Sequence, residues 1–174
     1  MKKKEKIEKI EKIENIKKNN KNILNNYIFN IVIGIVLILI DQLTKNLLIN
    51  KNITIIPNFL SLNYTQNIGG AFGIGNINFI TIFSILIIIG IIIFLIKENK
   101  KIPNLIPFTL ILAGSIGNLI DRISRGFVID FIDVNLFNFP NFNIADICIV
   151  IGVFILLYIY VIKELISKTK NREK

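Results

Sequence analysis

The sequence contains no histidine and no tryptophan, and its only cysteine is Cys148. The absence of histidine excludes metal sites with histidine ligands and catalytic triads that depend on histidine, and a lone cysteine excludes a disulfide framework. Charged residues are absent from residues 52–96, 102–120 and 147–162. A soluble domain does not leave stretches of this length uncharged, so the sequence predicts a membrane protein.

The apolar residues are concentrated in four segments. Hydrophobic residues make up 52% of the 174 residues, and the mean hydropathy is +0.60. A helix that crosses the ~30 Å hydrocarbon core of a bilayer needs about 20 mostly apolar residues. Segments at about residues 27–49, 79–96, 103–120 and 143–162 approach this length, and we predict an all-α membrane protein with four transmembrane helices.

The basic residues indicate how these helices are oriented. Nine of the 21 lysines and arginines lie in the first 27 positions, three lie in the loop at 97–104, and five follow Ile162. Four spans place these 17 residues on one side, which the positive-inside rule identifies as the cytoplasm. Both termini are therefore predicted to be cytoplasmic, with residues 51–78 and 121–142 outside or at the outer membrane interface. This orientation, with attraction to the lipid surface, accounts for the net charge of +9, and we expect no nucleic-acid partner.

Two segments lie outside the predicted membrane domain, which covers residues 28–166. Residues 1–27 form a lysine-rich extension in which Glu-Lys-Ile is repeated between positions 5 and 13, and residues 167–174 form a short tail. Charge runs of this kind are usually solvated. As a helix, the extension could instead lie as a basic amphipathic stretch on anionic headgroups.

Residues 53–66 differ from the helical segments. Alternating side chains around 59–64 and a high content of β-branched residues predict one or two short strands on the outer side. The following segment, 67–75, has four glycines in seven residues, which permits positive φ and close backbone approach. It fits a tight re-entry into the second span, and without a following lysine it is a weak candidate for a phosphate-binding loop.

Polar residues mark the outer ends of the first and third spans. Asp41 and Lys45 share one helical face, so Asp41 either forms an ion pair with Lys45 or supports a polar site at the outer end of the bundle. In the third span, residues 113–117 are mostly small, which lets helices approach closely in lipid. Asn118 and Asp121 follow on one face at the end of that helix.

Four aspartates lie within 26 residues at or just beyond the outer membrane boundary: Asp121, Asp130, Asp133 and Asp146. The only cations expected near them are Arg122 and Arg125. Ionisable residues at membrane depth are energetically costly and indicate a functional site. Two paired carboxyl groups can share one proton, so that one acts as a base while the other acts as an acid, and such a pair activates water for amide hydrolysis without a metal ion.

Asp146 also has a structural interpretation. Asn143 and Asp146 fit the start of the fourth helix, with Asn143 as the N-cap and Asp146 near the free amides of the first turn. Capping is compatible with catalysis, because the N-terminus of a helix stabilises an ionised carboxylate.

Four motifs occur in order along the chain: Asp41-Gln-Leu-Thr-Lys45, Asn67-Ile-Gly-Gly-Ala-Phe-Gly73, Gly117-Asn-Leu-Ile-Asp-Arg122 leading into Gly126-Phe-Val-Ile-Asp-Phe-Ile-Asp133, and Phe142-Asn-Ile-Ala-Asp146. In order and spacing they resemble the motifs of lipoprotein signal peptidase (signal peptidase II), over about residues 28–166. Any one motif alone is modest support, whereas four motifs on four spans of the predicted orientation are highly specific. One departure is Gly70, where alanine or valine is common in that family.

The resemblance implies an intramembrane aspartyl protease that removes the signal peptide of bacterial prolipoproteins by cutting before a diacylglyceryl-modified cysteine. It implies Asp130 and Asp146 as the catalytic aspartates, and a fold of four membrane helices with a small extracytoplasmic β-cradle. The supporting polar residues of the family correspond to Asp41, Asn67, Asn118, Asp121, Arg122 and Asn143.

The same resemblance implies the partners and the location. Prolipoprotein signal peptides, membrane lipids and globomycin-type peptide inhibitors are expected to bind. We expect the enzyme to act as a monomer in the bacterial cytoplasmic (inner) membrane, with no cofactor and no metal ion.

Two other hypotheses use the same aspartates. A small proton- or ion-coupled transporter also places carboxylates in the membrane, but here they cluster at one membrane face and no inverted repeat is visible. A membrane transferase would hold Mg²⁺ between aspartates, but Asp121, Asp130 and Asp133 do not form a dense acidic motif.

Overall fold

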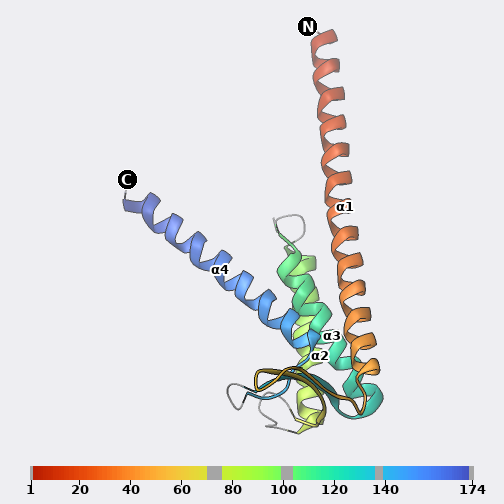
Figure 1. The fold of residues 1–174 in the computed structure, drawn as a ribbon. Coiled ribbons are helices and arrows are strands. Elements are labelled where there is room, and N and C mark those ends of the chain that lie inside the picture. The colour runs from red at the N-terminus through yellow and green to blue at the C-terminus, as the bar shows by residue number, and fades with distance from the viewer. Residues whose placement is uncertain (1, 70–75, 99–103, 136–138, 173–174) are drawn as a thin grey trace.

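The computed structural model describes residues 2–69, 76–98, 104–135 and 139–172. Four helices and three strands follow one another in the order α1 (Lys2–Leu47), β1 (Asn52–Ile56), β2 (Leu60–Asn67), α2 (Ile77–Lys97), α3 (Ile106–Arg125), β3 (Val128–Val134) and α4 (Ile144–Arg172). The sheet lies across one end of the helices, and both ends of the chain point away from it (Figure 1). The glycine-rich re-entry predicted for 67–75 falls mostly outside the described residues.

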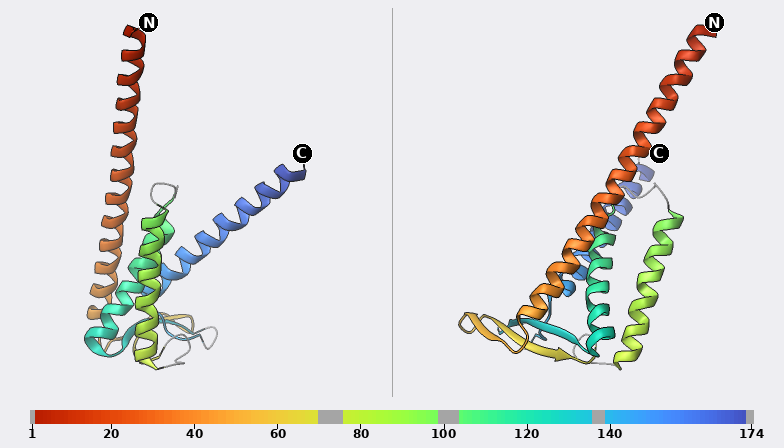
Figure 2. Two further views of the ribbon diagram at one scale, coloured as in Figure 1. Left: turned by 180° about the vertical axis from the view of Figure 1, so that it is seen from behind. Right: turned by 90° about the vertical axis from the view of Figure 1, so that its right-hand side faces the viewer.

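The four predicted spans are confirmed. Helical segments long and apolar enough to cross a membrane run over Asn15–Leu47, Ile77–Lys97, Ile106–Arg125 and Ile144–Ile166. The lysine-rich extension continues α1 without a break and projects beyond the other helices instead of turning to lie across them (Figure 2). At 1.5 Å per residue, α1 is about 69 Å long, roughly twice the thickness of the hydrocarbon core.

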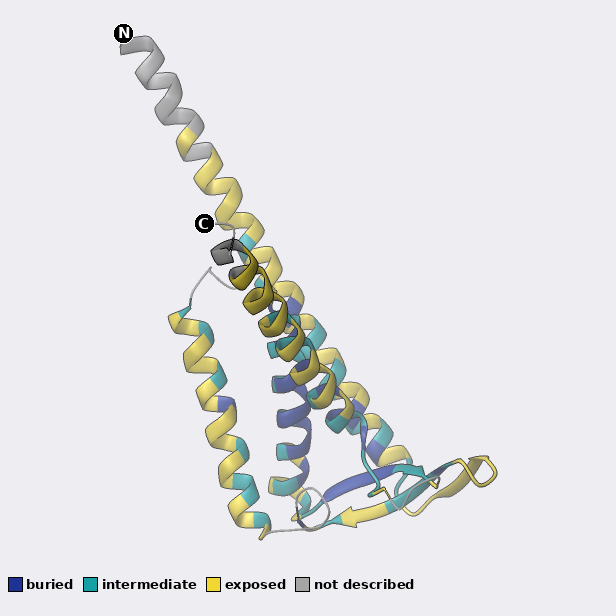
Figure 3. Ribbon diagram, turned by 90° about the vertical axis from the view of Figure 1, so that its left-hand side faces the viewer, coloured by how far each residue is buried: buried dark blue, intermediate teal, exposed yellow. Residues whose placement is uncertain are grey.

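Helix α3 is the centre of the bundle. It packs against α1, α2 and α4, and most of the buried helical residues belong to it (Figure 3). Among the described elements, α3 is the main neighbour of helix α2. Ile88 is the one buried residue of α2, so most of the surface of this helix faces lipid. The uncharged second span is therefore an outer wall of the bundle.

Small residues allow α3 to lie close to its neighbours, as the sequence predicts. A Cβ atom on Gly114 would collide with the carbonyl oxygen of Ala145 in α4, and one on Gly117 would lie 2.7 Å from Oδ2 of Asp41 in α1. In lipid, such contacts replace the hydrophobic effect as the source of helix association. The ends of α1, α3 and α4 beside the sheet can therefore bring their polar side chains together.

The three strands form one antiparallel sheet in the order β1-β2-β3. The strands predicted within 53–66 are confirmed as β1 and β2, which pair with each other. Strand β3 follows α3 directly, because Gly126 ends that helix in the left-handed conformation with φ of 77°. The chain returns past β3 to form a bridge between Phe142 and Ile132 before α4 begins.

Candidate active site

Asp130 and Asp146 meet at one cavity at the end of the bundle where the sheet lies. Asp130 lies in β3, and Asp146 lies in the first turn of α4. Both line a cavity of about 420 Å³, together with Asn67, Asn118 and Arg122. Two carboxyl groups that are 16 residues apart in sequence thus face the same space.

Asn143 connects the two carboxyl groups directly. Its side-chain Nδ2 donates to Oδ1 of Asp130 at 2.7 Å, and its backbone N–H donates to Oδ2 of Asp146 at 3.1 Å. The side chain of Asn143 is fully buried. One rigidly held residue therefore sets the relative position of both carboxylates.

The predicted N-cap of α4 is present. Oδ1 of Asn143 accepts from the backbone N–H of Asp146 at 3.0 Å, which is the reciprocal of the bond to Oδ2 of Asp146. This pair of bonds is a capping box, and it satisfies amides that the first helical turn leaves free. Capping and a place in the cavity are thus both properties of Asp146.

In each carboxyl group, the oxygen that Asn143 does not bind accepts a hydrogen bond from another side-chain amide. Nδ2 of Asn67 donates to Oδ2 of Asp130 at 2.9 Å, and Nδ2 of Asn118 donates to Oδ1 of Asp146 at 2.7 Å. Each carboxyl group therefore accepts two hydrogen bonds, one of them from Asn143. The amides orient the carboxyl groups without adding a charge at the cavity.

The pKa of Asp130 is raised from 3.8 to about 6. Burial is the largest cause, because it penalises the ionised form, and the negative charge of Asp146 acts in the same direction. The hydrogen bonds from Asn67 and Asn143 and the positive charge of Lys45 oppose the rise. Asp130 can therefore exchange a proton close to neutral pH, as an acid or base in catalysis requires.

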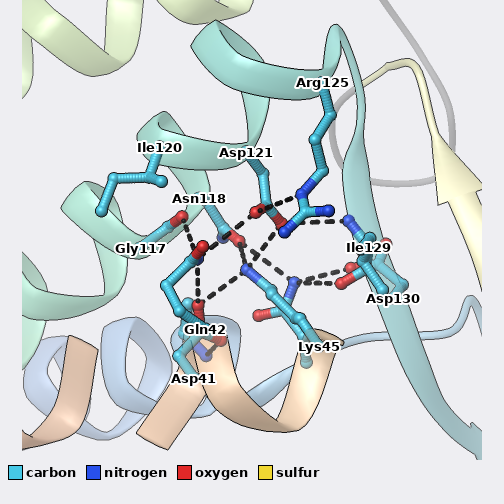
Figure 4. Close-up of polar contacts among 12 residues, drawn as sticks. Asp41, Gln42, Lys45, Gly117, Asn118, Ile120, Asp121, Arg125, Ile129 and Asp130 are labelled. Carbon is cyan, nitrogen blue, oxygen red and sulfur yellow. Dashed lines mark hydrogen bonds and ion pairs between the residues drawn. The ribbon is translucent and has the colours of Figure 1, made fainter. Parts of the chain in front are cut away.

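Lys45 is a buried cation whose charge acts on Asp130. Its Nζ lies 2.8 Å from Oδ2 of Asp41, 3.1 Å from Oδ2 of Asp121 and 2.9 Å from Oδ1 of Asn118 (Figure 4). Its side chain has no exposed surface. The expectation that Arg122 and Arg125 are the only cations near the aspartates is therefore wrong, because α3 brings Asn118 and Asp121 to a lysine that the sequence pairs only with Asp41.

Both interpretations of Asp41 hold. It forms the ion pair with Lys45, and its Oδ1 accepts from the backbone N–H of Ala145 at 3.0 Å, next to Asp146 in the first turn of α4. Asp41 thus ties the C-terminal end of α1 to the helix that carries Asp146. The buried charges of Asp41, Lys45 and Asp121 form a group that we call the Lys45 cluster.

A family model described as signal peptidase (SPase) II matches residues 33–162. The chain belongs to the signal peptidase II family. It is 38% identical over 149 residues to a lipoprotein signal peptidase of Staphylococcus haemolyticus, with 80% of this chain and 94% of the relative covered. A lipoprotein signal peptidase of Staphylococcus aureus is 37% identical over 155 residues, covering 83% and 94%.

A solved bacterial membrane enzyme structure agrees with this membership. It superimposes with a TM-score of 0.71 at 36% identity, covering 80% of this chain and 91% of that one. The chain is thus an aspartic-type signal peptidase II, a multi-pass membrane enzyme, and the transporter and transferase hypotheses are wrong.

The residues that the signal peptidase II motifs indicate occupy two adjoining places. Asp130, Asp146, Asn67, Asn118 and Arg122 line the cavity, while the other three lie behind it: Asp41, Asp121 and Asn143. Arg122 has its Nε buried, and this atom has no hydrogen-bond partner in the described part of the chain.

Asp121 and Asp133 have separate roles in the structure. Oδ2 of Asp121 accepts from the backbone N–H of Ile129 at 3.2 Å, which holds the strand next to Asp130. Asp133 is absent from the cavity lining, and its Oδ2 accepts from Asn63 of β2 at 2.7 Å. The four aspartates of the sequence cluster thus divide into a pair at the cavity and two structural carboxylates.

Gln42 also belongs to this region, although the sequence motif assigns it no role. Its Nε2 donates to the carbonyl oxygen of Gly117 at 3.1 Å and to Oδ1 of Asp121 at 3.3 Å (Figure 4). The signal in the sequence is its place between Asp41 and Lys45, in the polar end of an otherwise apolar span. It joins α1 to α3 beside the Lys45 cluster.

Proposed function

We propose that this signal peptidase II cleaves prolipoproteins just before a diacylglyceryl-modified cysteine, with Asp130 and Asp146 as its catalytic pair. The observation that carries the proposal is the pair itself: two carboxyl groups at one cavity, both hydrogen-bonded to Asn143. A shared site for two carboxyl groups supports acid and base roles within one water-activating unit.

Asp130 is the protonated partner in this proposal and Asp146 the ionised one. Protonated Asp130 donates to the scissile carbonyl oxygen, while Asp146 takes a proton from the attacking water. The raised pKa of Asp130 supports the first role. The N-terminus of α4 supports negative charge on Asp146, whereas the amide donors do not distinguish the two groups, because each carboxyl group accepts two. Because the two groups interact, they titrate as a pair.

The substrate enters from the side, through the membrane. On α4 the cavity is lined by Ile147, Val150 and Ile151, which are exposed on the lipid-facing surface of the bundle. A signal helix can reach the cavity along this apolar wall while the lipid on its cysteine stays in the bilayer. Globomycin-type peptide inhibitors would occupy the same cavity. Action as a monomer stays a prediction.

The test is to incubate the purified protein with a diacylglyceryl-modified prolipoprotein in detergent or nanodiscs and to measure the size shift of the product. We expect cleavage of this substrate and none of the same precursor without its lipid. Equal cleavage of both precursors would contradict the substrate proposal.

The same assay checks the proton assignment through its pH dependence. Asp130 loses its proton as the pH rises through about 6, so kcat/KM should fall above this pH, by about tenfold per pH unit. Below it, protonation of Asp146 should give the other limb of a bell-shaped profile. A rate that stays constant from pH 5 to pH 9 would show that no such proton is required.

Both termini are proposed to lie in the cytoplasm of a bacterium, with the enzyme in its cytoplasmic (inner) membrane. The distribution of basic residues supports this orientation. In a Cys148→Ala background, a cysteine at position 99 should be protected from a membrane-impermeant thiol reagent in intact cells, and a cysteine replacing Gln66 should be labelled. Labelling of position 99 from outside would reverse the topology.

A further inference from the structure

The hairpin formed by β1 and β2 exposes large apolar side chains. Ile53, Ile55, Ile56 and Phe59 are 40–51% exposed, and no charged residue lies in the hairpin. The turn is a compact one, with Pro57 followed by Asn58 at φ of 58° and a bond from the N–H of Phe59 to the carbonyl of Ile56. The exposed groups therefore belong to an ordered hairpin.

The strand register sorts the hairpin side chains by polarity. Ile53 pairs with Leu62 and Ile56 pairs with Leu60, and an irregularity between Thr54 and Ile56 adds one residue to β1. Cross-strand partners share a face and neighbours along a strand alternate, so this extra residue brings Ile53 and Ile56 to the same side. The result is an aliphatic face made of Ile53, Ile56, Leu60, Leu62, Ile132 and Val134.

The opposite face of the same region is polar. By the same register it carries Asn52, Thr54, Ser61, Asn63 and Asp133. A hydrogen bond of 2.7 Å between Asn63 and Asp133 confirms that these two side chains share a side. One face of the β1–β2 hairpin is aliphatic and exposed, and the other is polar. Only the aliphatic face therefore needs an apolar environment.

The position of the hairpin identifies that environment. Helix α1 ends at Leu47, which is 64% exposed on its lipid-facing surface, and β1 begins five residues later. The hairpin extends sideways from the end of the bundle (Figure 2). Alternation along β3 puts Asp130 on the aliphatic face, and Asp130 meets residues of α4 at the cavity, so this face is the one turned toward the helices.

We propose that the aliphatic face of the β1–β2 hairpin rests on the outer leaflet of the bilayer and anchors the sheet there. Strand β1 is the edge of the sheet, and its unpaired backbone groups need water or headgroups, so the side chains enter the upper acyl region while the backbone stays at headgroup depth. Lys51 precedes the hairpin and matches the lipid phosphates.

The anchor would also set the height of Asp130 above the membrane. Alternation along β3 puts Asp130 on the same face as Ile132 and Val134, which pair with β2. The proposal is independent of which carboxyl groups are catalytic, since it concerns only how the sheet is seated.

The absence of tryptophan from the chain allows a direct test. Ile53→Trp and Thr54→Trp place a single tryptophan at adjacent exposed positions on opposite faces of β1. Each variant is reconstituted in phosphatidylcholine–phosphatidylglycerol nanodiscs, with lipids brominated either high on the acyl chain or near its end. Retained thermal unfolding behaviour selects folded variants, and Ile56→Trp replaces Ile53→Trp if that variant fails to fold.

We expect the tryptophan at position 53 to emit at shorter wavelength than the one at position 54, and to be quenched several-fold more by bromine high on the chain. Acrylamide in the water should quench position 54 more. Equal quenching of both positions by lipid, or lipid quenching confined to position 54, would overturn the proposal. A lipid signal that disappears as the protein-to-lipid ratio rises would assign the face to a second copy of the chain instead.

Discussion

Asp130→Asn and Asp146→Asn are each expected to abolish cleavage, with a loss of about 10³-fold or more in kcat. Asparagine keeps the size of the side chain but cannot exchange a proton. Because the two groups act as one unit, the double variant should be little slower than either single variant. The measurement is the size-shift assay with diacylglyceryl-modified prolipoprotein at saturating substrate.

Asp133→Asn is the matched control. It lies on the same strand as Asp130, but it is bonded to Asn63 and does not line the cavity. Its activity should remain close to that of the unaltered enzyme. Substantial turnover by either Asp130→Asn or Asp146→Asn, or loss of activity only in Asp133→Asn, would mean that the catalytic pair is assigned to the wrong residues.

Thermal unfolding separates lost chemistry from lost structure in these variants. In the folded state the pKa of Asp130 is raised to about 6, so the folded protein holds this proton more tightly than the unfolded chain does. Stability from this group is therefore greatest below about pH 4 and falls by roughly 3 kcal/mol as the pH rises past 6. Asp130→Asn removes that loss, and at pH 8 it should unfold no earlier than the unaltered protein.

Lys45→Met is expected to destabilise the fold strongly. Methionine keeps most of the volume but leaves Asp41 as a buried carboxylate without its cation, and leaves Asp121 with only the partly exposed Arg125 as a partner. Breaking a buried pair in this way costs about 3–5 kcal/mol. Lys168→Met is the matched control, since Lys168 forms a pair of the same spacing with Glu164 at an exposed position and should lose under about 1 kcal/mol. Unfolding in detergent measures both.

The pH profile adds a second readout for Lys45. Its positive charge opposes the rise in the pKa of Asp130, so its removal favours the protonated carboxyl group. Where Lys45→Met remains folded, the basic limb of its rate profile should therefore move to higher pH. Equal loss of stability in the two lysine variants, with an unmoved basic limb, would show that the Lys45 cluster is no more than a surface-like ion pair.

Features that depend on neighbouring residues were accessible from the sequence. Charge-free runs predict the four membrane spans, because the length and polarity of a segment decide whether it can cross a bilayer. The two strands within 53–66 and the N-cap at Asn143 follow from local alternation and spacing in the same way. The resemblance of the ordered motifs to the signal peptidase II family predicts the pairing of Asp130 with Asp146. No local pattern of charge or spacing predicts it.

Features that depend on how the helices meet appeared only in the tertiary structure. Lys45 lies between Asp41 and Asp121 because glycines in α3 let α1 approach closely, and no local pattern reports that distance. The separation of Asp133 from the cavity is likewise decided by the register of β2 and β3, since each step along a strand reverses the face. The sequence alone determined which segments cross the membrane and which residue types could do the chemistry. Three-dimensional packing decided which of those residues meet, because buried charges are placed by contacts between elements far apart in the chain.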